Sequence, residues 1–167
     1  GSECTGKTTL AERLALRYET VWVREYGRQY VDALARPPAA EDIDPIGRGQ
    51  IAAEDEAARR ANRVLVLDTD LLSTLVYGRH YFGEVPSWLE PAVRARVPDL
   101  YLLCGIDVPW VADGVQRDRG HRRDEVQGLF RDAIRAQQSP FIELDGTVDE
   151  RLEQAVRAID LLLVPSP

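Results

Sequence analysis

The first eight residues, "GSECTGKT", place Gly1, Gly6, Lys7 and Thr8 in the pattern G-x-x-x-x-G-K-[ST]. Glycines at these positions permit backbone angles that aim several N–H groups at one point, and a following helix directs its positive end there. Such a loop binds phosphate oxygens, the lysine reaches the β- and γ-phosphates, and the threonine hydroxyl can ligate Mg²⁺. The segment therefore predicts a nucleotide-binding loop that opens a helix.

Lys7 supports this interpretation because of how rare lysine is in the chain. Of the 21 Lys and Arg residues, all but Lys7 are arginine. A phosphate loop needs a compact ammonium group on a flexible stem, and the planar guanidinium is a poor replacement for it. The alternative is that an arginine-rich composition left one lysine at this position by chance. We favour a true phosphate loop, which also requires a strand before Gly1.

No such strand is present in the sequence, which begins at Gly1 without a methionine. In a phosphate-loop fold that strand is central, and its removal would separate its two neighbours by roughly 9–10 Å. We therefore expect residues ahead of Gly1, either a few or a whole domain.

Short apolar runs at 20–23, 64–68, 100–104 and 141–144 predict the strands of a parallel sheet. Helical patterns lie between them at 6–18, 54–63 and 148–163. The alternation predicts an α/β fold, a three-layer α/β/α domain of the phosphate-loop NTPase type over residues 1–167. Residues 35–49 are rich in Pro and Gly and residues 117–123 in arginine, so we expect both segments to be mobile elements.

Composition excludes several classes of protein. The net charge of −7 is poorly suited to nucleic acid or an anionic membrane. The apolar runs are too short to span a bilayer, and no signal segment opens the chain. Cys4 and Cys104 fit neither a metal-ligand spacing nor a disulfide framework. These features favour a cytoplasmic protein.

Ligands of open α/β sheets bind beyond the carboxyl ends of the strands. There the sequence has "REYGRQY" after 20–23, "DTD" after 64–68 and "GIDVPWVADG" after 100–104. Of Asp68 and Asp70, one is predicted to hold Mg²⁺ and the other to face an acceptor hydroxyl. The alternative for Asp70 is a helix N-cap. Glu25 is the rival for the general base, with a surface pair to Arg28 as its alternative.

Five segments together resemble the ribosylnicotinamide kinase domain of bacterial NadR-type proteins: "GSECTGKTTL", "VREYGRQY", "LDTDLLST", "YLLCGIDVPWVADGVQRD" and "IELDGTVDERLEQA". The resemblance covers nearly the whole chain in the same order, and "REYGRQY" and "DVPWVADG" are its most specific parts. It implies ATP-dependent phosphorylation of the ribose hydroxyl of nicotinamide riboside to nicotinamide mononucleotide. It also implies that an adenylyltransferase domain can precede the kinase. Cys4 and Thr5 depart from the two serines expected in the loop, but both are small enough for it.

With this resemblance, Trp110 is predicted to stack on the charged nicotinamide ring, with Asp113 favouring the same cation. The alternative is a tryptophan that closes the end of the core. Tyr26 and Tyr30 lie four residues apart, and packing against the sheet is as good an interpretation as ligand contact. The acceptor-binding residues that we predict are Glu25, Tyr26, Arg28, Asp70, Trp110 and Asp113.

The segment "RDRGHRR" predicts a lid that closes on ATP and neutralises the transferring phosphoryl group. A solvated charged surface is its alternative. Gly146 and Thr147 are predicted to cradle the adenine, although Thr147 could also be an N-cap whose capping box Glu150 completes. The predicted ATP-binding residues are Gly1, Glu3, Cys4, Thr5, Gly6, Lys7, Thr8, Thr9, Arg119, Gly146 and Thr147. The predicted metal ligands are Thr8 and Asp68, and the predicted catalytic residues are Lys7, Glu25, Asp68, Asp70, Arg117 and Arg122.

Two other functions remain open from the sequence. The first is a kinase of another nucleoside, or a simple NTPase. The second is a regulatory module that senses nucleotides without useful turnover. Lys7, Thr8 and the paired aspartates argue against the second, because sensing does not require all of them.

Overall fold

The computed structural model describes residues 1–109 and 122–164. These residues divide into two compact units, Gly1–Leu14 with Pro98–Pro167, and Ala15–Val97. In the described residues, the strands form two separate two-stranded parallel sheets, one in each unit. The predicted mixture of helices and parallel strands is confirmed.

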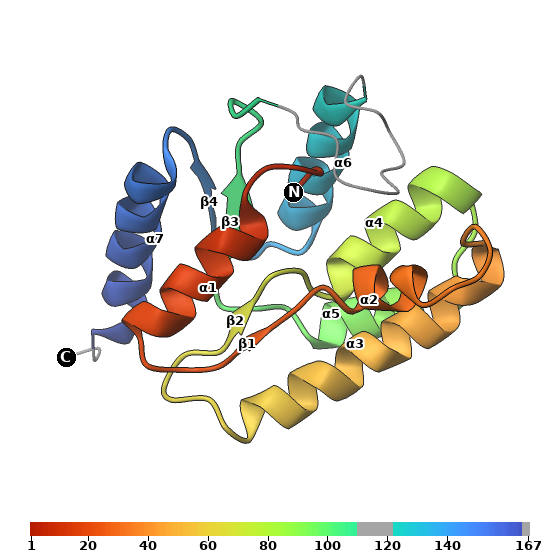
Figure 1. The fold of residues 1–167 in the computed structure, drawn as a ribbon, viewed down its shortest axis with the longest axis horizontal. Helices are drawn as coiled ribbons and strands as arrows, with labels where there is room; N and C mark the ends of the chain where they lie inside the picture. The colour runs from red at the N-terminus through yellow and green to blue at the C-terminus, as the bar shows by residue number, and fades with distance from the viewer. Residues whose placement is uncertain (110–121, 165–167) are drawn as a thin grey trace. The chain divides into compact units, whose positions relative to one another are not determined.

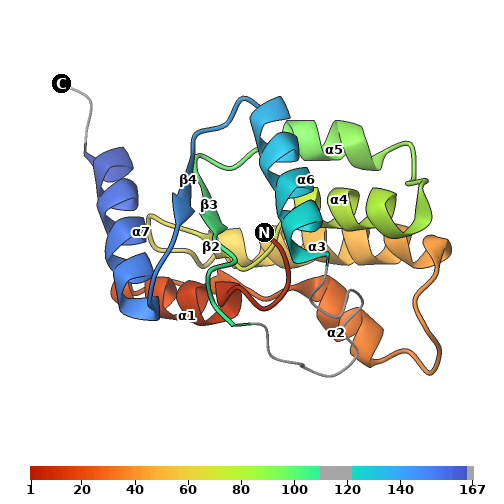
Figure 2. The same ribbon diagram turned by 90° about the horizontal axis from the view of Figure 1, so that it is seen from above.

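The first unit contains a parallel pair between β3 (Tyr101–Cys104) and β4 (Phe141–Leu144), with Tyr101 opposite Phe141. Helices α6 (Arg123–Ala136) and α7 (Val148–Leu163) lie on opposite sides of this pair, as both views in Figures 1 and 2 show. Each helix buries an apolar stripe at helical spacing against the strands, which include the fully buried Leu103 and Leu144. The buried helical residues are Val126, Phe130 and Ile134 of α6 and Ala155 and Ile159 of α7. This packing fixes the two strand ends of the unit.

The second unit pairs β1 (Trp22–Val23) in parallel with β2 (Val66–Leu67). Its helices are α2 (Tyr26–Asp32), α3 (Ile43–Ala58), α4 (Leu71–Phe82) and α5 (Leu89–Ala95), with a short 3₁₀ turn, η1 (Ala40–Asp42), before α3. The two strands are shorter than the predicted runs at 20–23 and 64–68, but both lie inside them. The carboxyl ends of β1 and β2 therefore meet at one edge, as the sequence predicted.

The first helix, α1 (Lys7–Arg17), follows the phosphate loop as predicted. Leu10 and Leu14 are buried with 4% and 1% of their surface exposed, while Tyr18 lies just beyond the helix end. Helix α7 also matches its predicted range. The helix predicted at 54–63 is wrong in its bounds, because α3 starts at Ile43 and ends at Ala58.

The prediction of a loop over residues 35–49 is wrong from Ile43 onward, where α3 begins. Pro45 lies in the first turn of the helix, where a backbone N–H has no intrahelical acceptor, so proline costs nothing there. A Cβ atom added to Gly47 would lie 2.9 Å from Cη2 of Trp88, and one added to Gly49 would lie 2.0 Å from Cε1 of Tyr26. These glycines therefore make room for aromatic rings against the helix instead of breaking it.

The preceding connection is held by Asp42, whose surface is only 2% exposed. Its carboxylate accepts hydrogen bonds from both terminal nitrogens of Arg36 at 2.7 and 2.9 Å, from the N–H of Ala39 at 2.7 Å and from the hydroxyl of Tyr30 at 3.2 Å. Chiefly because of the Arg36 guanidinium, the pKa of Asp42 falls to about 2. An ionised carboxylate thus fastens a segment that composition alone marked as loosely held.

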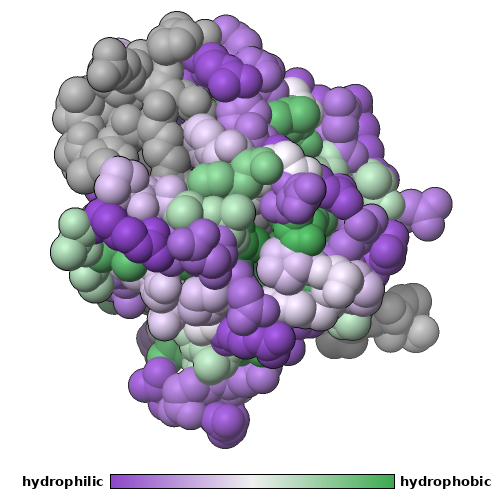
Figure 3. Space-filling model, turned by 90° about the vertical axis from the view of Figure 1, so that its right-hand side faces the viewer, coloured by the Kyte–Doolittle hydropathy of each residue, from purple (hydrophilic) through white to green (hydrophobic). Residues whose placement is uncertain are grey.

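The molecular surface agrees with the composition. The face drawn in Figure 3 is hydrophilic over most of its area, with hydrophobic residues in smaller groups, as a mean hydropathy of −0.30 leads one to expect. Within the parts of the chain that the structure describes, no helix has the length and apolar character needed to cross a membrane.

Candidate active site

The phosphate loop, residues 1–6, precedes α1 and adopts the backbone that the motif requires. Cys4 and Gly6 have positive φ angles of 52° and 79°, the left-handed conformation that turns successive N–H groups toward one point. The Thr5 hydroxyl donates to the Ser2 carbonyl at 3.1 Å, and Lys7 Nζ donates to the same carbonyl at 2.7 Å. The lysine therefore lies folded back across the loop.

Two arginines hold carbonyl groups of this loop. Arg123 donates from Nη2 to the Cys4 carbonyl at 3.3 Å, and Arg151 donates from Nη1 to the Thr5 carbonyl at 2.7 Å. In a trans peptide unit the N–H of the next residue points opposite to the carbonyl. The N–H groups of Thr5 and Gly6 are consequently directed away from the arginines, as phosphate binding by the loop requires.

Gln127 of α6 fastens the start of the loop to β3. Its side chain is 3% exposed, its Oε1 accepts from the Ser2 N–H at 3.0 Å, and its Nε2 donates to the Cys104 carbonyl at 2.9 Å. Gly1 packs so closely that an added Cβ would lie 3.3 Å from both the Cys104 carbonyl and Gln127 Oε1. The loop is therefore anchored by a buried amide.

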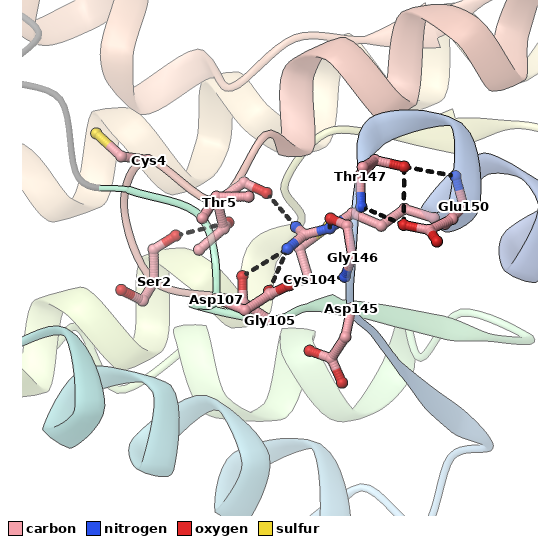
Figure 4. A network of polar contacts seen from close by, with 12 residues as sticks. Ser2, Cys4, Thr5, Cys104, Gly105, Asp107, Asp145, Gly146, Thr147 and Glu150 are labelled. Atoms are coloured by element: carbon pink, nitrogen blue, oxygen red, sulfur yellow. Dashed lines mark hydrogen bonds and ion pairs between the residues drawn. The ribbon is translucent and has the colours of Figure 1, made fainter.

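Arg151 of α7 joins the phosphate loop to the two strand ends of the first unit. Besides Thr5, its guanidinium donates to the carbonyls of Gly146 at 2.8 Å and Gly105 at 3.4 Å and pairs with Asp107. Figure 4 shows Thr5, Gly105, Asp107 and Gly146 gathered around this network. Arg151 is only 3% exposed, so its buried charge is stabilised by the Asp107 carboxylate and by these carbonyl oxygens.

Asp107 completes the network from the loop after β3. It accepts from the N–H of Gly146 at 2.6 Å, and this hydrogen bond is the main reason that the pKa of Asp107 lies below its usual range. An ionised Asp107 thus links the loop after β3 to the loop between β4 and α7. The second of these loops is the one predicted to hold adenine.

Thr147 is the N-cap of α7, which confirms the capping alternative. The hydroxyl of Thr147 accepts from the Glu150 N–H at 3.3 Å, and the Glu150 carboxylate accepts from the Thr147 N–H at 2.7 Å. This reciprocal pair lowers the pKa of Glu150, mainly through the backbone hydrogen bond. Gly146 has a positive φ of 92°, and an added Cβ would lie 2.5 Å from Glu150 Oε2. Contact of Gly146 and Thr147 with adenine stays a prediction.

In the second unit, the acceptor-side carboxylates follow β1 and β2. The Asp68 N–H donates to the Val23 carbonyl at 2.9 Å, which continues the parallel pairing past the end of β2. Glu25 is half-buried at the N-cap position of α2, so the segments that carry Glu25 and Asp68 lie at the same edge. The predicted convergence of these two strand ends is confirmed.

Asp70 is the N-cap of α4, and its Oδ1 accepts from the Ser73 N–H at 3.3 Å. The capping alternative is therefore confirmed for Asp70, and the bond also fixes the direction of its carboxylate. Asp68 and Asp70 are both half-buried.

The other residues predicted to bind the acceptor have different surroundings. The Tyr26 ring packs against Gly49 and its N–H donates to Gln50 Oε1 at 3.2 Å, while Arg28 is exposed on α2. Packing is therefore one role of Tyr26, and its contact with an acceptor stays a prediction. Trp110 and Asp113 lie outside the described residues.

Of the predicted lid arginines, Arg117 and Arg119 also lie outside the described residues. Arg122 occupies the N-cap position of α6 and forms two hydrogen bonds with Glu125 at 2.9 and 2.8 Å. The neighbouring Arg123 contacts the phosphate loop and donates to the Val108 carbonyl at 3.0 Å. Arg123, at the carboxyl end of the arginine-rich segment, thus anchors the phosphate loop.

The oxygen ligands proposed for magnesium fit the chemistry of that ion. The Thr8 side chain is exposed in the first turn of α1, and Asp68 follows β2. Among residues 1–109 and 122–164, no group of three or more His, Cys, Asp and Glu side chains could hold a metal ion. Mg²⁺ commonly uses only one or two protein ligands with phosphate oxygens and water, so a threonine and one aspartate suit a metal that arrives with a nucleotide.

Sequence reasoning missed Arg151, Gln127 and Gln50 as site residues. Arg151 lies at helical spacing with the buried Ala155 and Ile159, so a charged residue on the apolar face of α7 was a usable signal. Gln127 follows Val126 on the buried side of α6. Gln50 falls next to a segment interpreted as a loop, which concealed its helical position.

Comparison with known proteins agrees with this geometry. The profile of the AAA domain family matches residues 1–151. The chain belongs to this AAA domain family. Its membership accounts for the phosphate loop, and nucleotide binding is the property that such a loop implies.

Two relatives of this AAA-domain chain are named "Trifunctional NAD biosynthesis/regulator protein NadR". The one from Escherichia coli K12 is 31% identical over 153 residues, covering 87% of this chain and 37% of that protein. The one from Salmonella typhimurium LT2 is 30% identical over 168 residues, covering 95% of this chain and 40% of that protein. The chain thus spans less than half the length of these relatives.

A solved structure, described as a crystal structure of NadR protein in complex with NR, has the same fold. It superposes with a TM-score of 0.71 at 27% identity, covering 96% of this AAA-domain chain and 49% of that one. The similarity to NadR-type proteins that five sequence segments indicated is therefore confirmed over nearly the whole chain.

Proposed function

We propose that this chain is an ATP-dependent kinase that phosphorylates the ribose hydroxyl of nicotinamide riboside to give nicotinamide mononucleotide. One observation carries the proposal: a complete phosphate loop occurs in a chain that shares its fold, over 96% of its length, with a NadR protein bound to NR. The relatives' names place them in NAD biosynthesis, the pathway to which this product belongs.

On the nucleotide side, the N–H groups of Thr5 and Gly6 would bind phosphate oxygens of ATP. Lys7 Nζ would exchange the Ser2 carbonyl for the β- and γ-phosphates, a movement that its flexible stem allows. Thr8 and Asp68 would hold Mg²⁺, which neutralises charge on the phosphates when bound. Gly1, Glu3, Cys4 and Thr9, which lie in the loop and in the first turn of α1, would also contribute to ATP binding.

On the acceptor side, Glu25 or Asp70 would orient the ribose hydroxyl and accept its proton. Asp70 is already directed by its bond to the Ser73 N–H, so little reorganisation is needed for it to meet a hydroxyl. Tyr26, Arg28, Trp110 and Asp113 would bind the nicotinamide and ribose, with Trp110 stacking on the charged ring. Arg117, Arg119 and Arg122 would form the lid over the phosphates.

We propose that residues 1–167 act as a single kinase domain, although they divide into two compact units. The phosphate loop belongs to the first unit, and Glu25, Asp68 and Asp70 belong to the second. Phosphoryl transfer requires a phosphate-binding group and an acceptor-orienting group in the same protein, and this chain carries candidates for both.

The direct test is a panel of nucleosides with ATP and Mg²⁺, with product identified by chromatography. We expect nicotinamide mononucleotide from nicotinamide riboside at a kcat/KM at least about tenfold above adenosine, uridine or cytidine. A faster reaction with another nucleoside would make the protein a different kinase, and ADP release that needs no acceptor would make it an NTPase. Binding of both ligands without product would favour the sensing module.

Arg151→Met should weaken binding of Mg·ATP about tenfold, the equivalent of one hydrogen bond to a charged group. The reason is that Arg151 holds the Thr5 carbonyl and, through Gly146, the loop after β4. Calorimetric titration with Mg·ATP measures the loss, and the KM for the riboside should change less than twofold. Arg157→Met is the matched control, because Arg157 lies on the same helix with 73% of its side chain exposed. Equal ATP affinity in the Arg151 and Arg157 variants would contradict the role of Arg151.

A further inference from the structure

We propose that Gln50 is a positioning residue for the acceptor carboxylates, fixing the segment of Glu25–Tyr26 relative to the segment of Asp68–Asp70. The inference rests on the proposed function, since it concerns the hydroxyl-binding side of the same reaction. Gln50 lies on α3 and is 2% exposed.

The contacts of Gln50 reach the main chain of both segments. Its Oε1 accepts from the Tyr26 N–H at 3.2 Å, and its Nε2 donates to the Thr69 carbonyl at 2.9 Å. Tyr26 directly follows Glu25, and Thr69 lies between Asp68 and Asp70. One side-chain amide therefore spans the two segments that carry Glu25 and Asp70, the candidates for orienting the hydroxyl, and the proposed metal ligand Asp68.

The chemistry of these partners requires an amide. The Tyr26 N–H needs an acceptor and the Thr69 carbonyl needs a donor, and among long, uncharged side chains glutamine offers both from one planar group. If the amide were flipped, its NH₂ would face the Tyr26 N–H and its oxygen would face the Thr69 carbonyl, so neither hydrogen bond could form. An ionised glutamate would repel the Thr69 carbonyl, and a methionine would leave both buried groups without a partner.

The amide is itself held from the other side. Gln50 Nε2 also donates to Glu54 Oε1 at 2.9 Å, and Arg96 donates to Glu54 Oε2 at 3.2 Å. Glu54 is 6% exposed, and burial, assisted by the negative charge of Asp70, raises its pKa. The charge of Asp70 thus acts on Glu54. Glu54, four residues after Gln50 on α3, holds the Gln50 side chain in place through their hydrogen bond.

The consequence for the reaction is geometric. A carboxylate can orient a hydroxyl only from a narrow range of positions, and a displacement of about 1 Å at a reacting group can cost about 10²-fold in rate. Gln50 touches neither reactant and acts through the two segments that it joins.

The test compares Gln50→Met with Gln127→Met, using whichever nucleoside the wild type phosphorylates fastest. Both glutamines are buried, and each bridges a backbone N–H to a carbonyl, but Gln127 holds the phosphate loop. We expect Gln50→Met to lower kcat/KM for the acceptor about 10–100-fold with ATP affinity changed less than twofold. Gln127→Met should show the reverse, with weaker ATP binding. Equal losses for both ligands in the Gln50 variant, or no loss, would overturn the proposal.

Gln50→Glu supplies a second readout that a purely structural role would not give. A protonated carboxyl group can donate to the Thr69 carbonyl and accept from the Tyr26 N–H, whereas its ionised form cannot donate. The neighbouring Glu54 and Asp70 favour the protonated form, and Arg96 opposes it. We expect the activity ratio of the variant to the wild type to rise at least about threefold between pH 8 and pH 6.

A constant ratio across this range would contradict the positioning role even if Gln50→Met failed to fold.

The proposed function and the proposed role of Gln50 would be contradicted by different results. A wild type with no kinase activity on any nucleoside overturns the function, whereas an active wild type with an acceptor-independent loss in the variants overturns only the role of Gln50.

Discussion

Lys7→Ala is expected to lower kcat by about 10²–10³-fold, the cost of removing one preorganised charge at a phosphoryl group. The loop itself should persist, because Gln127, Arg123 and Arg151 hold its backbone independently of the lysine. The loss should therefore appear in kcat at saturating Mg·ATP, with the thermal unfolding midpoint nearly unchanged. Steady-state kinetics and a melting curve measure the two quantities.

Lys7→Arg should fail almost as completely as Lys7→Ala. The rigid guanidinium cannot fold across the loop as Nζ does when it contacts the Ser2 carbonyl at 2.7 Å. Arg17→Ala, in the last turn of the same helix, is the control and should retain wild-type kcat. A kcat within twofold of wild type for Lys7→Ala would show that the ammonium group takes no part in the transfer.

Asp68→Asn is expected to reduce kcat about 10²-fold and to raise the Mg²⁺ concentration for half-maximal activity about tenfold. Asp70→Asn should instead lower kcat/KM for the riboside with an unchanged Mg²⁺ requirement. Asp70 is the N-cap of α4, and an asparagine there can also accept from the Ser73 N–H, so the substitution removes the charge and preserves the helix start. Initial rates over a Mg²⁺ series, at fixed total ATP, distinguish the two variants.

A matched control for both aspartates is Asp132→Asn, a loss of the same charge at an exposed position on α6. It should leave both the Mg²⁺ requirement and kcat at wild-type values. An identical shift of the Mg²⁺ requirement in the Asp68 and Asp70 variants would contradict the assignment of Asp68 as the metal ligand.

The local features of this protein were predictable because each depends on neighbouring residues. The phosphate loop needs a glycine directly before the lysine, and Gly6 indeed adopts a positive φ of 79°. Helix α7 has both a capping box at Thr147 and apolar residues at helical spacing, and the structure places it where the pattern does. The strand runs at 100–104 and 141–144 likewise contain β3 and β4.

The start of α3 was not predictable from local sequence. Proline and two glycines within residues 45–49 are typical of a loop, yet the rings of Trp88 and Tyr26 occupy the space beside Gly47 and Gly49. The aromatic rings that make glycine suitable in this helix come from residues far away along the chain. A prediction from the residues next to α3 therefore cannot include them.

The nucleotide loop, the mixed α/β class and the carboxylates at the strand ends could be predicted from the sequence, because they follow from backbone conformation and from the periodicity of neighbouring residues. The polar residues that hold the loops in place could be identified from the folded chain and not from the sequence. Gln50, Gln127 and Arg151 each contact carbonyl groups of other segments. A sequence does not show whether a long polar side chain bonds to a distant carbonyl or to water. That depends on whether the side chain is buried in the folded protein.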